Sequence, residues 1–135
     1  MDVSNLKAAD TATIHVKNAD GEALYDDKQP VRITLHGPGS HAASVVQARQ
    51  TLRATKRYND NEGKLPQLTV EERRAEAAED LAALTVRFEH LTYGDKTGHD
   101  LFVAVYSDPA LGFIRDQVAK AAADWALFKA GSSAS

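Results

Sequence analysis

Two histidines and a serine flank a glycine-proline-glycine turn in the stretch HGPGSH, residues 36–41, and are the first candidates for a reactive site. A phosphate cradle would need further glycines in register, or a lysine followed by serine or threonine, and neither is present. A metal site would need a third ligand and supporting hydrogen bonds, which two histidines five residues apart do not supply. Under ordinary turn rules, Gly37 and Pro38 end a strand. Gly39 then permits a sharp turn, and Ser40 caps a helix.

The remaining polar groups also lack the spacing of a catalytic or metal site. His15, His90 and His99 are scattered, and no nucleophile with a neighbouring base emerges from the sequence. The acids at 20–22 and 26–27 do not follow the alternating pattern of a calcium-binding loop. The chain has no cysteine, which excludes disulfides, thiolate zinc sites and thiol nucleophiles. We therefore expect no catalytic residue, no metal and no cofactor, and a protein that is not an enzyme.

The composition is typical of a globular protein with one modest core. The chain has 135 residues, and its 19 acidic and 16 basic residues give a net charge of −3. This balance lacks the basic surface of a nucleic-acid-binding protein. No apolar run approaches the roughly 18 to 20 residues of a membrane span, and the N-terminal segment has no hydrophobic stretch of a signal peptide. We expect a cytoplasmic protein that binds neither nucleic acid nor membrane.

Short strands are expected near the N-terminus. Residues 13–17 and 31–36 alternate apolar and polar side chains, and residues 22–25 can form a short strand between them. Three strands in sequence predict a small antiparallel β meander over residues 11–37, preceded by a flexible arm at 1–10.

A helical part with three main helices is expected over residues 38–130, before a flexible tail at 131–135. The first helix would run from Ser40 to about Tyr58, because alanine, glutamine, arginine and leucine favour helix there. The second opens at a capping box formed by Thr69 and Glu72. Its expected apolar face comprises Ala78, Leu81, Leu84 or Thr85, and Phe88.

The third helix begins at Ser107-Asp108-Pro109, where a capping side chain precedes a proline. It carries an apolar stripe at spacings of three and four residues. The stripe includes Leu111, Ile114, Val118, Trp125 and Phe128. The fold class is therefore α+β, in a single domain spanning residues 1–135.

Two helix faces are candidates for protein interaction. The apolar stripe of the last helix can form either core or a helix-in-groove contact. In the first helix, Val45, Ala48 and Leu52 fall at helical spacing beside a basic stripe. That stripe comprises Arg49, Arg53, Lys56 and Arg57. It can be a solvated face, a docking face for an acidic partner, or a partner for the acids of EERRAEAAEDLAAL within the chain or between copies.

Several stretches, in order along most of the chain, resemble the tail assembly chaperones of long-tailed bacteriophages. The pieces are Gly21–Leu24, Val31–Gly37, Leu81–Phe88 and Tyr106–Val118, with Phe128 near the end. A tryptophan-glycine pair that often follows the middle helix in that family is replaced here by Phe88-Glu89-His90.

This resemblance implies a chaperone that coats the tape measure protein, keeps it soluble and presents it to tail tube subunits. It also implies a longer, frameshifted form of the same protein as a partner, with self-association into a homo-oligomer as a further possibility. The protein would act in the host cell cytoplasm and be absent from the finished particle. Leu111, Ile114, Val118, Trp125 and Phe128 are the expected working face, with Arg49, Arg53 and Arg57 as a secondary charged contact. The alternatives are a minor structural component of the tail or connector and, more remotely, a small hydrolase or nucleotide-binding domain.

Overall fold

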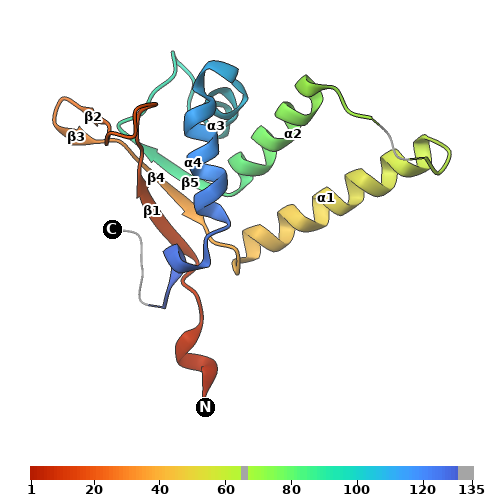
Figure 1. Ribbon diagram of the computed structural model, residues 1–135, viewed down its shortest axis with the longest axis horizontal. Coiled ribbons are helices and arrows are strands. Elements are labelled where there is room, and N and C mark those ends of the chain that lie inside the picture. Colours follow the sequence, from red (N-terminus) through yellow and green to blue (C-terminus); the bar gives the residue numbers. More distant parts are fainter. Residues whose placement is uncertain (65–66, 131–135) are drawn as a thin grey trace.

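The computed structural model describes residues 1–64 and 67–130 and has the expected α+β fold (Figure 1). The main sheet has three antiparallel strands in the order β1-β4-β5, and β2 and β3 form a separate hairpin. The strands are β1 (Thr11–His15), β2 (Tyr25–Asp26), β3 (Gln29–Pro30), β4 (Arg32–His36) and β5 (Thr85–Glu89). The α-helices are α1 (His41–Asp60), α2 (Val70–Ala83), α3 (Gly98–Ser107) and α4 (Gly112–Ala122). Three short 3-10 helices are η1 (Val3–Leu6), η2 (Pro109–Leu111) and η3 (Trp125–Phe128).

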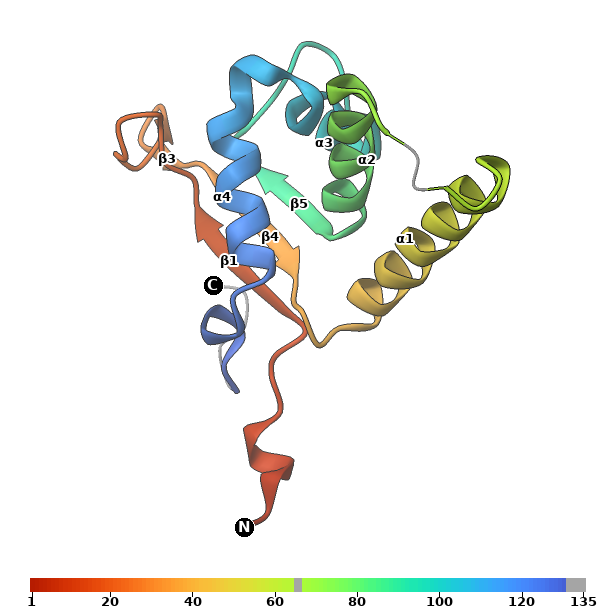
Figure 2. The same ribbon diagram turned by 45° about the vertical axis from the view of Figure 1, so that its right-hand side comes forward.

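The core lies between the sheet and helices α2, α3 and α4, whereas α1 projects away from this body (Figures 1 and 2). Ile33 and Leu35 of the central strand β4 are fully buried. From the helices, the fully buried side chains include Val105, Tyr106 and Val118. The Tyr106 hydroxyl shares a hydrogen bond of 2.8 Å with the Thr85 hydroxyl, and burial raises the pKa of Tyr106 far above its ordinary value.

The expected β meander over residues 11–37 is wrong in its third strand. The third strand of the sheet is β5, in a segment that we had expected at the end of the second helix. Thr85 and Val86 are β-branched, and β5 pairs with β4 in antiparallel register, including Ile33 opposite Phe88. Residues 22–25 contribute only an isolated bridge between Lys17 and Ala23 and the start of the β2–β3 hairpin.

The helical part also differs from expectation, because its described residues form four α-helices and contain β5. Helix α3, residues 98–107, was not expected, since LFVAVY is apolar throughout and shows no amphipathic period. The expected last helix is divided into η2, α4 and η3. Asp108 and Asp124 each accept a backbone hydrogen bond two residues on, from Ala110 at 2.9 Å and Ala126 at 3.0 Å. These Asx turns begin the two 3-10 helices and interrupt the α-helix.

Both ends of the described chain meet the HGPGSH turn. Ser40 caps α1 as expected, because its hydroxyl oxygen accepts a bond of 3.2 Å from the Ala43 N–H. The glycines have another role as well: they leave room for the aromatic rings of η3. A Cβ on Gly37 would lie 2.6 Å from Cδ2 of Phe128, and one on Gly39 would lie 3.2 Å from Cζ3 of Trp125. Space beneath the Trp125 ring, and not a special φ angle, is therefore what the structure requires at Gly39.

The expected flexible arm is held at its C-terminal end. The Ala9 N–H donates to the Phe128 carbonyl at 2.8 Å, and the Gly37 N–H donates to the Asp10 carbonyl at 2.7 Å. The expected flexible tail at 131–135 lies outside the described residues.

Candidate protein-interaction surface

The apolar face expected on the last helix lies largely in the core. Ile114, Val118 and Phe128 are 5%, 0% and 0% exposed, and Leu111 is half-buried. These residues pack against the sheet, so the face is not available to a partner in this conformation. Trp125 is the exception, because it is 60% exposed over the Gly39 turn.

The basic stripe of α1 binds the acids of α2 within the same chain, one of the alternatives raised by the sequence. Arg53 forms a bidentate pair with Asp80, in which Nη1 lies 3.3 Å from Oδ2 and Nη2 bonds Oδ1. Arg49 reaches the same carboxylate at 3.1 Å, and Arg57 pairs with Glu76. The three arginines are thus committed to α2 and are not free as a secondary contact.

Asp80 is the centre of this arginine cluster. Its side chain is only 12% exposed, and burial by itself disfavours the carboxylate. Hydrogen bonds from Arg53, Gln50 and Arg49 outweigh that effect, so the pKa of Asp80 lies below its ordinary value of 3.8. The hydrogen bond to Asp80 also raises the pKa of Arg53. A charged Asp80 therefore fixes α1 beside α2.

This arrangement turns the apolar stripe of α1 toward solvent. Val46 is the only buried residue of the helix. Val45 and Leu52, which lie on another side of the helix, are 50% and 71% exposed. Helical periodicity alone correctly groups Val45, Ala48 and Leu52 on one face, but it cannot tell which face meets the body.

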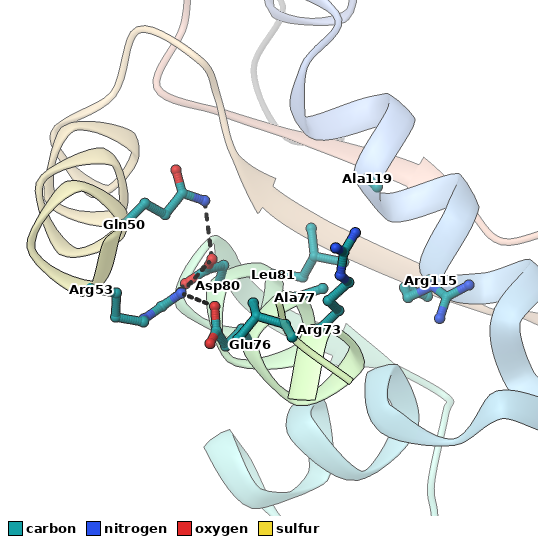
Figure 3. Close-up of a pocket in the computed structure, with 10 residues that line it drawn as sticks. Gln50, Arg53, Arg73, Glu76, Ala77, Asp80, Leu81, Arg115 and Ala119 are labelled. Atoms are coloured by element: carbon teal, nitrogen blue, oxygen red, sulfur yellow. Dashed lines mark hydrogen bonds and ion pairs between the residues drawn. The ribbon is translucent and has the colours of Figure 1, made fainter. Parts of the chain in front are cut away.

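A groove with a volume of about 470 Å³ runs between α1 and α4, with α2 as its floor (Figure 3). Gln50 and Arg53 come from α1, and Arg115 comes from α4. The remaining lining residues are Leu68, Arg73, Glu76, Ala77, Asp80, Leu81 and Ala119.

The floor of the groove presents Ala77 and Leu81 beside the acids Glu76 and Asp80, which are paired with Arg53, and the cations Arg73 and Arg115 flank it. Ala77 and Leu81 of α2 face Ala119 of α4 across the groove. No described residue provides an ion-pair or hydrogen-bond partner for the Arg73 side chain. Among the described residues, the Arg115 side chain forms an ion pair only with the neighbouring Asp116, at 3.2 Å. An apolar strip flanked by these two cations is suited to an amphipathic segment whose flanks are acidic.

Two pairs of titratable residues outside the groove have structural roles. The Tyr93 hydroxyl donates to Asp108 at 2.8 Å; this bond raises the pKa of Tyr93 and lowers that of Asp108. His99 lies 3.2 Å from Glu79. Within residues 1–64 and 67–130, no group of three or more histidine, cysteine, aspartate or glutamate side chains is placed to hold a metal ion. None of the described helices is both long and apolar enough to span a membrane.

Comparison of the chain with models of known protein families, with curated proteins and with solved structures finds no significant match.

The sequence did not identify the groove. Its walls and its floor come from three separate helices, so no local pattern marks it. In the sequence Arg73 stands beside Arg74 and has Glu76 three residues on, so its charge gives no signal of a groove.

Proposed function

We propose that this protein is a phage tail assembly chaperone that binds the tape measure protein through the groove between α1 and α4. The ordered motifs that resemble that family support the proposal. The groove is the structural observation that carries it, because it offers an apolar strip between two cations: Arg73, whose side chain has no partner among the described residues, and Arg115, which is paired only with the exposed Asp116.

The binding step would be the docking of an amphipathic helical segment of the tape measure protein on α2. Its apolar side would cover Ala77, Leu81 and Ala119, and acidic residues on its flanks would approach Arg73 and Arg115. Such a contact is shallow, so one copy would bind weakly. Many copies along one long client would bind it strongly by multivalency and keep its apolar faces from aggregating.

In this proposal the coated client is then presented to tail tube protein, and a frameshifted longer form acts beside the chain described here. Both steps would take place in the host cell cytoplasm, and the chaperone would leave before the particle is complete.

Co-expression with the tape measure protein of the same phage tests the proposal. The wild-type chain, alone or with its longer form, should keep the client soluble and co-purify with it. Ala77→Glu, which places a carboxylate on the groove floor, and Arg73→Glu should both lose this rescue. Lys96→Glu makes the same charge change as Arg73→Glu in an exposed loop outside the groove and should retain it.

Failure of the wild-type chain in both combinations would contradict the chaperone function. Equal rescue by all four proteins would leave the function standing but contradict the groove as its site. Recovery of the protein from purified particles at a fixed stoichiometry would instead favour a structural component of the tail.

A further inference from the structure

The outer face of α1 carries a continuous stripe with the 4-3 spacing of a coiled coil. Val45 and Leu52 are 50% and 71% exposed, and Tyr58 at the edge of the stripe is 48% exposed. Along the helix, the stripe consists of His41, Val45, Ala48, Leu52, Thr55 and Asn59. Alternating steps of four and three residues keep one seam facing a partner helix over the whole length of α1.

Nothing in the described chain covers this seam. The side of α1 that carries Arg49, Arg53 and Arg57 is bound to α2. The seam lies on a different side of the helix and does not contact the rest of the described chain. Figures 1 and 2 show α1 standing clear of the sheet and of α3 and α4. Twenty residues give a helix about 30 Å long, which is enough for several layers of side chains.

We propose that this seam pairs two copies of the chain through an antiparallel α1–α1 contact. A two-fold axis near position 50 sets Ala48 opposite Leu52 of the partner subunit. The same axis sets Val45 opposite the partner's Thr55, so small and large side chains alternate across the seam. An isologous contact requires this kind of self-complementarity.

Charge also favours a second copy over a charged partner. One flank of the seam is uncharged, with Thr51 near its own symmetry mate and Ser44 near the partner's Tyr58. On the other flank, Arg49 lies near its own symmetry mate, with its charge balanced by Asp80 of the same chain, and Lys56 is paired with Asp60 at 3.2 Å. The seam therefore presents no unpaired charge for an acidic or basic protein to recognise.

This inference does not depend on the proposed chaperone function. The groove lies between α1, α2 and α4, whereas the seam lies on the outer side of α1, so a pair of copies would leave both grooves open. The two surfaces can therefore be tested by separate variants.

Site-specific crosslinking tests the geometry, and the absence of natural cysteine makes single-cysteine variants unambiguous. Thr51→Cys lies beside the symmetry axis, whereas Ala54→Cys is an exposed position of the same helix that points away from the seam. A short bis-maleimide reagent should link Thr51→Cys into dimers several-fold faster than Ala54→Cys. Equal rates, or faster linking of Ala54→Cys, would overturn the proposed pairing.

Sedimentation velocity over a concentration series tests the energetics. The wild-type chain should show a monomer–dimer equilibrium. Leu52→Asp should raise the dimer dissociation constant at least about a hundredfold. Each copy loses one buried leucine, and each leucine contributes about a tenfold gain in affinity. Ala54→Asp is the matched control and should leave the constant unchanged. Leu52 is exposed in the single chain, so circular dichroism should show both variants folded. A wild-type monomer at every concentration, or equal effects of the two variants, would overturn the inference.

Discussion

Replacing Asp80 by asparagine should release α1 from the body while leaving the rest of the fold intact. The substitution keeps the size of the side chain but removes the charge that Arg49 and Arg53 share. The two arginine side chains are 40% and 25% exposed, and that of Asp80 is 12% exposed. Exposed ion pairs contribute at most about 1 kcal/mol, and breaking a fully buried pair costs about 3–5 kcal/mol. The partly buried Asp80 cluster is intermediate between these two cases, so Asp80→Asn should reduce the free energy that holds α1 on α2 by about 2 kcal/mol.

The loss of stability should be confined to α1, because Val46 is the only residue that this helix buries. A cost of about 2 kcal/mol corresponds to roughly 30-fold faster amide exchange in α1 if those amides exchange by local opening. Hydrogen exchange with mass spectrometry should show this increase in peptides from α1 and little change in β4. Glu79→Gln removes a neighbouring charge that is half exposed and should have no such effect. Unchanged exchange in α1, or equal acceleration throughout the sheet, would refute the assignment of Asp80 as the anchor of α1.

Two further predictions follow from the same contacts. Gly37→Ala should destabilise the protein by about 2–3 kcal/mol in denaturant unfolding, because the new Cβ would lie 2.6 Å from the buried Phe128 ring. Gly39→Ala should cost less than about 1 kcal/mol, since the exposed Trp125 ring can shift; equal costs would contradict this explanation. Acid should detach α1, because the folded state lowers the pKa of Asp80: its stabilisation is present above pH 3.8 and is lost as pH falls through the lowered folded-state pKa. An NMR pH titration should show that change in α1 amides of the wild type and not in Asp80→Asn.

Features fixed by neighbouring residues could be predicted from the sequence. The Ser40 cap is one example, and the capping box of Thr69 and Glu72 is another. In both, the donor and acceptor are separated by three residues, so the pattern contains the whole interaction. The α+β class also followed, because strand alternation and helical composition occur in separate parts of the chain.

Features decided by distant contacts could not be predicted. The segment at 85–89 becomes a strand because β4, about fifty residues earlier, offers an edge for pairing. The apolar run at 101–106 becomes helix because Leu101, Val105 and Tyr106 fill the core on one side of α3. The orientation of α1 depends on Asp80, which lies 27 residues beyond Arg53, and this orientation creates both the groove and the exposed seam.

The most direct test of the proposed function is hydrogen exchange of the chain, alone and in complex with the proposed client, a phage tape measure protein. Binding in the groove should slow exchange in the facing segments of α2 and α4, with little change in the β2–β3 hairpin at the far side of the sheet. Absence of a complex, or protection confined to segments outside the groove, would contradict a chaperone that holds its client on α2.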